Sequence, residues 1–347
     1  YFSKVRGKST AYLDIYRDSL ILASATGLFF KINLDNLQNE NFLPIKFNSN
    51  IFDYFNNDKF FLKSYYGIKD ILIDNDNLFV SYSNEVSKNC FNTGILRSKI
   101  KNENLIFEKF FSHKECKSEE KSKYKTFQMG QAGGRIIKFK NDYLLTHGSY
   151  SEFDEVQDEN SIFGKILLID KFGNLKKIFS KGHRNPQGLN LLKNNIILQT
   201  EHGPQGGDEI NIIKEGKNYG WPVASYGFHY EGQKNMNKFY PLPSSHDDFE
   251  EPIFYFKNAI AISQILEVPK KFNKEKNNSI FLASMKVNQK FGDKINLYNL
   301  KFQDDKIIIY DFIPIDERIR DLVYEKSSNK IFMFLDTSAS IGVLSVN

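Results

Sequence analysis

The sequence predicts an all-β fold, a six-bladed β-propeller, and two observations carry that prediction. Short apolar runs rich in Ile, Val, Phe and Tyr recur between clusters of Asn, Asp, Gly and Lys, which is the pattern of strands joined by turns. One unit, a strand, a short polar turn and a second strand, also occurs six times at a mean spacing of about 62 residues. That spacing accommodates about four strands per unit, as in a propeller blade. A β-sandwich with coincidental spacing is the alternative that this pattern leaves open.

The six units account for the chain in order. They cover residues 11–27, 69–84, 134–149, 187–203, 263–286 and 320–338. Additional strand pairs, such as 165–180 and 294–312, lie between the units and supply further strands of the blades. Because a propeller is one domain, we expect residues 1–347 to form a single domain without an internal linker.

Three charged stretches interrupt the repeated pattern. They are residues 112–125, 151–160 and 270–278. Charge runs usually form solvated loops, so we expect three surface insertions. The second of them could also line a mouth of the propeller.

The composition excludes several classes of protein. With 347 residues, 41% hydrophobic and 26% charged, the chain can form a globular core. Its net charge of +5 is small for this length and gives no case for binding nucleic acid or an anionic membrane surface. The chain lacks the run of about 18 apolar residues that a membrane-spanning helix needs. It begins at Tyr1 without an initiator Met or an apolar signal core, as expected of a mature or trimmed chain, so the missing signal does not argue for the cytosol.

The cysteine content is low. Cys90 and Cys116 are too few for a disulfide framework, and their spacing matches no metal motif. One disulfide and two free thiols are both compatible with the sequence.

Chemically useful residues concentrate in segment 182–222. Arg184 and Asn185 stand just before Pro186, where the chain is extended and side chains project from a loop. Gly203 and Pro204 follow a predicted strand, and a turn there leaves backbone carbonyls free for a hard cation such as Ca²⁺.

Acidic residues follow in the same segment. Asp208 and Glu209 could add carboxylate oxygens to a cation site, with Tyr219 nearby. A glycine-rich turn flanked by solvated acids is the alternative interpretation of the segment.

This segment resembles the soluble glucose/sorbosone and aldose sugar dehydrogenases that depend on pyrroloquinoline quinone (PQQ). The resemblance rests on GHRNPQGL (182–189), EHGPQGGDEIN (201–211) and GKNYGWP (216–222). Shorter motifs extend it over about residues 130–340: GGRI (133–136), GKILLID (164–170), EEPIFYF (250–256), SMK (284–286) and RIRD (318–321). The first 130 residues match only weakly.

The resemblance implies a fold, a location and an activity. Proteins of this family are six-bladed propellers, mostly periplasmic or secreted. The implied reaction is hydride transfer from a small-molecule sugar or alcohol to PQQ, beside a Ca²⁺ ion, with an external electron acceptor. No nucleic-acid partner and no membrane span are implied.

The resemblance also assigns cofactor ligands by position. The matching residues that contact PQQ are Arg184, Asn185, Lys286, Arg318 and Arg320. PQQ is a tricarboxylate, and the Arg guanidinium suits bidentate carboxylate binding. Without the resemblance, the two Arg of R-x-R-D would be interpreted as a surface or inter-blade salt bridge.

The implied metal ligands fall into two groups. Gly203 and Pro204 match the pair whose carbonyls bind the Ca²⁺ ion beside PQQ, which polarises the quinone. Asp208, Glu209 and Tyr219 match residues near a structural Ca²⁺ ion.

The catalytic positions depart from the family pattern. The family's general base is the His of H-x-x-G-R, and this chain has QAGGR, with Gln131 at the His position. Ser149 stands where the family has the carboxylate that orients that His. Glutamine has no pKa in the working range and cannot act as a base. His147, two residues before Ser149 on the same predicted strand end, is either a substitute base or an ordinary inter-blade histidine.

The substrate pocket is expected to differ as well. The family's Gln contact has no clear counterpart near residues 64–70, and a Trp and a Thr of some members are missing around 254–263.

Two functions therefore remain open. Survival of the whole cationic set favours an enzyme, a PQQ- and Ca²⁺-dependent sugar dehydrogenase with a changed base. Loss of both dyad residues favours a non-catalytic propeller that binds a ligand or a partner protein. Convergence of the cations and the Gly203 and Pro204 carbonyls on one cavity would favour the enzyme.

Overall fold

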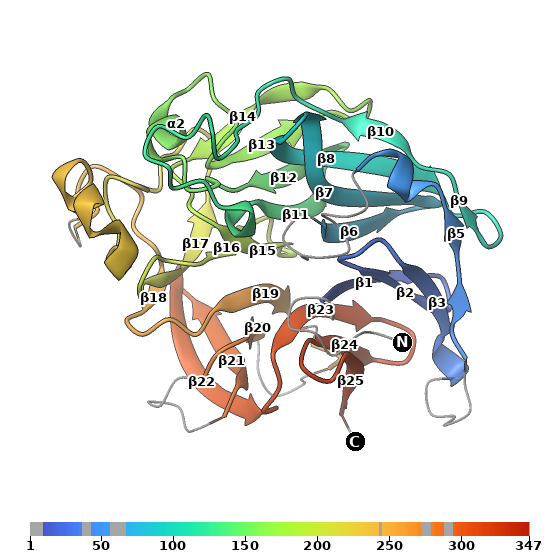
Figure 1. The fold of residues 1–347 in the computed structure, drawn as a ribbon. Coiled ribbons are helices and arrows are strands. Elements are labelled where there is room, and N and C mark those ends of the chain that lie inside the picture. The colour runs from blue at the N-terminus through green and yellow to red at the C-terminus, as the bar shows by residue number, and fades with distance from the viewer. Residues whose placement is uncertain are drawn as a thin grey trace.

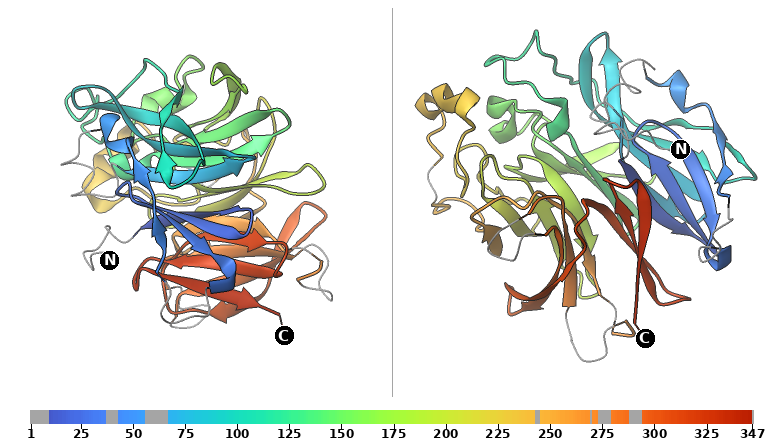
Figure 2. Two further views of the ribbon diagram at one scale, coloured as in Figure 1. Left: turned by 90° about the vertical axis from the view of Figure 1, so that its right-hand side faces the viewer. Right: turned by 60° about the horizontal axis from the view of Figure 1, so that its bottom comes forward.

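The protein is a six-bladed β-propeller (Figure 1). The computed structural model describes residues 10–36, 43–55, 67–242, 245–268, 270–272, 279–287 and 294–346. Six antiparallel sheets fan around a common axis, as the two further views in Figure 2 make clear. The predicted fold class is confirmed, and the sandwich alternative is excluded.

Each sheet runs outward from its innermost strand in chain order. The first three blades are β1 (Ala11–Tyr16), β2 (Ser19–Ser24), β3 (Phe29–Asn33) and β4 (Ile45–Lys46); β6 (Ile68–Asp74), β7 (Asn77–Ser87), β8 (Cys90–Lys99) and β10 (Glu108–Phe111); and β11 (Gly133–Phe139), β12 (Asp142–His147), β13 (Lys165–Ile169) and β14 (Leu175–Lys181). The last three are β15 (Pro186–Leu191), β16 (Ile197–Glu201), β17 (Asp208–Ile213) and β18 (Phe254–Phe256); β19 (Ile262–Glu267), β20 (Ser279–Ser284), β21 (Asn296–Gln303) and β22 (Lys306–Pro314); and β23 (Ile319–Glu325), β24 (Lys330–Leu335) and β25 (Ser340–Ser345).

A few small elements lie in the connections between the blade strands. They are the parallel pair β5 (Asn48–Ser49) and β9 (Asn104–Leu105) and the short helices η1 (Leu34–Asn36), η2 (Ile51–Asp53), η4 (Met129–Gln131), α2 (Phe153–Gln157) and η5 (Glu231–Lys238). No helix in the described ranges is long and apolar enough to cross a membrane.

The six inner strands close the ring. Each of β1, β6, β11, β15, β19 and β23 packs beside the next, and β23 packs beside β1. They begin within one residue of the six predicted unit starts. Sequence periodicity therefore located the blades correctly, because a strand–turn–strand repeat is encoded locally.

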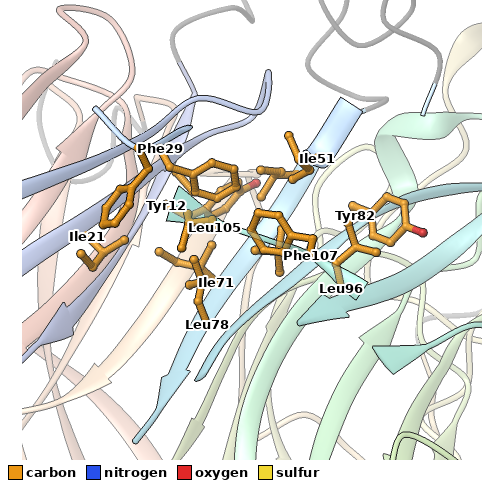
Figure 3. Packing of buried hydrophobic residues seen from close by; sticks show 14 of the residues in the cluster. Tyr12, Ile21, Phe29, Ile51, Ile71, Leu78, Tyr82, Leu96, Leu105 and Phe107 are labelled. Carbon is orange, nitrogen blue, oxygen red and sulfur yellow. The ribbon is translucent and has the colours of Figure 1, made fainter. Parts of the chain in front are cut away.

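Apolar side chains fill the space between neighbouring blades. Between the first two blades, Phe29 of β3 and Ile71 of β6 pack with Leu96 of β8 and Phe107 in one buried cluster (Figure 3). Phe29 and Phe107 have ring centroids 5.2 Å apart. Similar clusters lie between the other blades.

One buried ion cluster ties blades together at the axis. The Arg135 guanidinium of β11 donates to Asp70 of β6 and to Asp321 of β23, each at 2.7 Å. It also donates to the backbone carbonyls of Gln187 at 2.6 Å and Arg320 at 3.1 Å. Since Arg135 and its partners come from four inner strands, this residue holds the centre of the ring in register.

The charged insertions are more ordered than expected. Cys90 and Cys116 form a disulfide, which fixes insertion 112–125 to the start of β8. Insertion 151–160 contains α2, whose Phe153 and Val156 are buried. The expectation of a solvated loop was therefore wrong for 151–160, whose helix buries apolar side chains, whereas 112–125 is a mostly exposed loop that the disulfide tethers. Of the third, residues 273–278 lie outside the described ranges.

Candidate active site

The residues singled out from the sequence gather where the inner strands begin. Gln131 precedes β11, Arg184 and Asn185 precede β15, and Arg318 precedes β23. Hydrogen bonds join these strand starts: the Gly133 N–H donates to Asn185 Oδ1 at 3.4 Å. One mouth of the propeller channel therefore collects side chains from several blades.

Gln131 and Ser149, which the resemblance predicts at the positions of a base and its orienting acid, are in contact. The Ser149 hydroxyl donates to Gln131 Oε1 at 3.2 Å, and Gln131 Nε2 donates to Gln128 at 2.9 Å. The backbone N–H of Ser149 also donates to the Arg184 carbonyl at 2.8 Å. The pair keeps the proximity that a base and its orienting acid need, but neither side chain accepts a proton near neutral pH.

His147 is part of the blade interior. Its Nε2 accepts the backbone N–H of Thr93 at 3.1 Å, and its Nδ1 therefore donates to the Gly148 carbonyl at 3.0 Å. The ring is fully buried against Phe163 and Tyr150, and burial lowers its pKa to about 3. This placement favours the inter-blade structural role over a substitute base.

Strand geometry separates His147 from Ser149. Strand β12 ends at His147, so Ser149 lies in the following turn, where Tyr150 and Ser151 have positive φ. The expectation that the two side chains share a strand face was wrong, because that rule applies only within a strand.

Arg184 is a buried cation at the mouth. Its Nη1 donates to the carbonyls of His202 at 3.0 Å and Gly203 at 2.8 Å, and its guanidinium lies 5.4 Å from the Trp221 ring centroid. Burial lowers its pKa. Its Nε atom finds no hydrogen-bond partner among the described residues. A buried guanidinium with an open donor is suited to an anionic ligand.

The hydrogen bonds of Asn185 hold neighbouring backbone segments together. Its Oδ1 accepts from Gln187 Nε2 at 2.9 Å as well as from Gly133, and its carbonyl accepts the His202 N–H at 3.2 Å. Asn185 thus links the starts of β11 and β15 beside Arg184.

The turn at Gly203 and Pro204 is tightly built. A side chain at Gly203 would lie 2.1 Å from the Gly206 carbonyl oxygen, so only glycine fits. The Gly203 N–H donates to Asp208 Oδ1 at 3.1 Å, while its carbonyl already accepts from Arg184. Pro204 lines a cavity beside this turn.

Both oxygens of the Asp208 carboxylate accept backbone hydrogen bonds. Besides Gly203, it accepts the N–H groups of Ile260 at 2.9 Å and Ala261 at 2.7 Å. Both carboxylate oxygens are thus bonded to backbone, and the side chain fixes the Gly203 turn against the start of β19. Within the described ranges, no group of three His, Cys, Asp or Glu side chains is placed to hold a metal ion.

Glu209 and Tyr219 do not form one site with Asp208. Glu209 is buried opposite Glu201 in the strand register, and burial, with repulsion from Glu201, raises its pKa well above its usual value. The Tyr219 hydroxyl donates to the Ile212 carbonyl at 2.6 Å. Ile212 is four residues along β17 from Asp208, about 13 Å at the usual rise per residue.

Arg318 and Arg320 share one carboxylate. Arg320 Nη2 lies 2.9 Å from Asp336 Oδ2, and Arg318 Nε lies 3.8 Å from the same oxygen. Arg318 also donates to the Met285 carbonyl at 2.8 Å. The motif therefore forms a salt bridge, but this bridge lies within one blade and not between blades, because Asp336 directly follows β24, the strand paired with β23.

Lys286 lies on the wall of a cavity of about 650 Å³ at this mouth. Besides Pro204, the cavity is lined by three lysines and three aromatic side chains: Lys234, Lys257, Lys286, Phe228, His229 and Tyr230. Its described lining contains no carboxylate. Tyr230 also interacts electrostatically with Arg184. Lys286 directly follows Met285, whose carbonyl accepts a hydrogen bond from Arg318, so Arg318 lies close to this cavity without lining it.

The structure adds two residues that sequence reasoning missed. Trp221, the single Trp of the chain, packs against Arg184. Lys69, the second residue of β6, is buried near Arg320. In the sequence, Lys69 could have been noticed as a charged residue at the start of an otherwise apolar strand. It lies in the first 130 residues, where the resemblance to the family is weak.

The described residues place the buried Arg184 guanidinium and the Lys286 side chain near a cavity lined by aromatic residues. The amide of Gln131 cannot act as a general base.

Comparisons with known proteins show the family and the fold of the chain. The family model described as Glucose / Sorbosone dehydrogenase matches residues 56–343. Aldose sugar dehydrogenase YliI of Escherichia coli is 35% identical over 150 residues, which is 38% of each chain. Quinoprotein glucose dehydrogenase B of Acinetobacter calcoaceticus is 43% identical over 82 residues, 20% of this chain and 17% of that protein. Each alignment thus spans less than half of the curated relative.

Solved structures share the fold over nearly the whole chain. A structure titled glucose dehydrogenase has a TM-score of 0.74 at 19% identity and covers 97% of this chain and 95% of its own. The PQQ-bound form of aldose sugar dehydrogenase from Streptomyces coelicolor has a TM-score of 0.64 at 15% identity, covering 95% and 88%. At these identities the likeness establishes the fold.

Proposed function

The chain belongs to the glucose/sorbosone dehydrogenase family, and from that premise we propose that it binds PQQ at the cationic mouth and oxidises a sugar or alcohol. The proposal is supported by two links to the cavity that Lys286 lines: Arg184 interacts with Tyr230 of its wall, and Arg318 donates to the carbonyl of Met285, the residue before Lys286. Each of these three cations lies in a motif whose position matches a PQQ ligand of the family, and an external electron acceptor completes the turnover.

The residues fit a tricarboxylate. Arg184 is buried with an open Nε donor, and Arg318 and Arg320 together face one acid, Asp336. Lys286 stands on a cavity wall with two further lysines. Fixed cations of this kind bind carboxylates strongly where water is excluded. When bound, PQQ supplies the two-electron acceptor for hydride removal from the substrate.

A Ca²⁺ ion at Gly203 and Pro204 fits less well. The Arg184 guanidinium donates to the Gly203 carbonyl at 2.8 Å, so a cation there competes with it for the same oxygen. Gly203 and Pro204 would hold a Ca²⁺ ion through their carbonyls only if the Gly203 oxygen were shared with, or released by, the Arg184 guanidinium. No separate Ca²⁺ site is proposed at Asp208, Glu209 and Tyr219, because these side chains are held apart.

The protein residues around the dyad positions orient rather than transfer protons. Gln131 presents an amide bonded to Ser149 and Gln128, which positions a substrate hydroxyl but cannot take its proton. We therefore propose slow oxidation, with the proton leaving to water. The second candidate, a non-catalytic propeller that binds a ligand or partner protein, is favoured by this same loss.

A location outside the cytosol is part of the proposal. The Cys90–Cys116 disulfide is typical of oxidising compartments, which agrees with a periplasmic or secreted protein.

The test is a titration of PQQ into the purified protein with Ca²⁺, followed by quinone absorbance and Trp221 fluorescence, with an EDTA control. Trp221 reports on the site because it is the single Trp and packs on Arg184. Saturable, EDTA-sensitive quenching followed by dye reduction with aldoses supports the proposal. Binding without dye reduction favours the non-catalytic alternative, and no binding at micromolar PQQ contradicts the cofactor site.

A further inference from the structure

The cavity that Lys286 lines has room for more than one side chain of a ligand. Its volume of about 650 Å³ is typical of small-molecule sites. Tyr230 of its wall interacts electrostatically with Arg184, a cation that the proposed function assigns to PQQ. A ligand in this cavity therefore lies next to the proposed cofactor position.

Backbone contacts fix two walls of the cavity to the turn that follows Pro204. Gln205 and Phe228 exchange N–H···O hydrogen bonds of 2.8 and 3.1 Å, which hold the aromatic wall. On the other side, an added Cβ at Gly206 would lie 2.4 Å from the Lys257 carbonyl oxygen. The segments that carry Phe228 and Lys257 thus pack on the same short turn, and the backbone sets their separation.

The aromatic wall exposes two large rings. Phe228 is 71% exposed and Tyr230 is 47% exposed. Exposed aromatic rings that line a concave site are suited to pack against the apolar C–H face of a sugar ring. Aromatic side chains also lose little conformational entropy when they bind, because each has only two torsions.

The charged side chains that line the cavity are all lysines. Lys234, Lys257 and Lys286 line it, and no carboxylate does so among the described residues. Lys234 pairs with Glu231 at 3.1 Å, but both side chains are exposed, and such a pair is weak in water. In the PQQ complex of the proposed function Lys286 is occupied, so Lys234 and Lys257 remain for a second ligand.

We propose that this cavity selects a sugar that carries an anionic group, a carboxylate or a phosphate, and that Lys257 and Lys234 determine this specificity. Phe228 and Tyr230 pack on the sugar ring, and the two lysines pair with the anion. The inference rests on the proposed function, since it names the substrate class of the same site. A neutral aldose uses the aromatic wall alone and binds more weakly than its acidic counterpart.

The first test measures binding without PQQ and without turnover. Methyl β-glucoside and methyl β-glucuronide, whose anomeric oxygen is blocked, are titrated into the apo-protein at low ionic strength and followed by ligand-observed NMR. The two glycosides differ only at carbon 6, so the ratio of their affinities reports the anionic group. Exposed ion pairs to two lysines should favour the glucuronide about 5- to 10-fold, and added salt should remove that preference. Equal affinities, or no binding of either glycoside, overturn the inference.

Charge reversal at Lys257 distinguishes this cavity from the net charge of the protein. Lys257→Glu should lower the glucuronide-to-glucoside affinity ratio about 10-fold, because repulsion replaces attraction. The matched control, Lys177→Glu, makes the same change in net charge on β14, the outermost strand of its blade, and should leave the ratio unchanged. Both lysines are exposed, so both variants should fold. Equal ratios in the two variants overturn the inference.

The aromatic wall is tested by Phe228→Ala. This variant should weaken both glycosides by a similar factor and leave their affinity ratio unchanged, since both present the same sugar ring. Unchanged affinity for both glycosides overturns the placement of the sugar in this cavity.

The second test uses PQQ-loaded protein and compares kcat/KM for glucose, glucuronate and glucose 6-phosphate. A higher value for either acidic sugar supports the inference, and the better of the two identifies the anionic group. Glucose oxidation without preference for an acidic sugar keeps the proposed function and overturns the inference. A Lys257-dependent preference for the glucuronide in a protein that does not bind PQQ keeps the anionic-sugar site and contradicts the cofactor.

Discussion

Restoring the base dyad tests the interpretation of the active site most directly. The double variant Gln131→His, Ser149→Asp places an imidazole and a carboxylate at two positions that already touch, since Ser149 Oγ lies 3.2 Å from Gln131 Oε1. At that separation the new carboxylate accepts one imidazole N–H and leaves the other nitrogen to face the mouth. We expect the double variant to oxidise aldoses faster than the wild type.

The magnitude follows from what each residue supplies. A positioned general base is worth roughly 10²- to 10⁴-fold in rate. Residue 131 is 5% exposed, and burial without a partner lowers the pKa of an imidazole, as it does for His147. Gln131→His alone therefore supplies a weak base, and we expect a gain of about 10-fold. The carboxylate introduced by Ser149→Asp raises the imidazole pKa and fixes its tautomer, so the double variant should gain about 10²- to 10³-fold.

The assay is dye reduction by PQQ-loaded protein over a panel of aldoses, with kcat/KM determined for the wild type, both single variants and the double variant. Ser149→Asp alone is the control, because it adds a carboxylate without a base and should not accelerate oxidation. PQQ affinity is measured in parallel for each protein. A double variant that binds PQQ as the wild type does, and is no faster, would refute the dyad argument.

Three further predictions concern stability and are measured by urea denaturation. Arg135→Met leaves two buried carboxylates without their counter-ion and should lower the free energy of unfolding by about 3–5 kcal/mol; a loss under about 1 kcal/mol would show that this ion cluster does not hold the blades together. Replacing Cys90 and Cys116 by Ser opens a loop with a sequence separation of 26, and loop entropy predicts a loss of about 3.5 kcal/mol, which reduced wild type should reproduce. In the unfolded chain, His147 is protonated below its ordinary pKa of 6.5, whereas in the folded protein its pKa is lowered to about 3. The free energy of unfolding is therefore highest above pH 6.5 and decreases as the pH falls below that value. His147→Gln should abolish about 3 kcal/mol of that fall between pH 6.5 and 4, and identical pH profiles for variant and wild type would contradict it.

The sequence by itself determined the blades and the location of the mouth. Inner strands such as β6 and β15 begin within one residue of the predicted unit starts, because alternation and turn residues are local properties of the chain. The motifs at Gln131 and Arg184 directly precede inner strands, so they lie at the same end of those strands.

Tertiary structure alone decided which side chains meet. Asp208 was predicted to serve a cation, yet its oxygens are taken by backbone N–H groups that arrive from the next blade. His147 was predicted beside Ser149, but the turn after β12 sends the two apart. Lys69 and Arg320 are distant in the sequence, and their charges interact only because β23 closes the ring against β1. Contacts of this kind depend on closure of the whole propeller, and no local pattern encodes them.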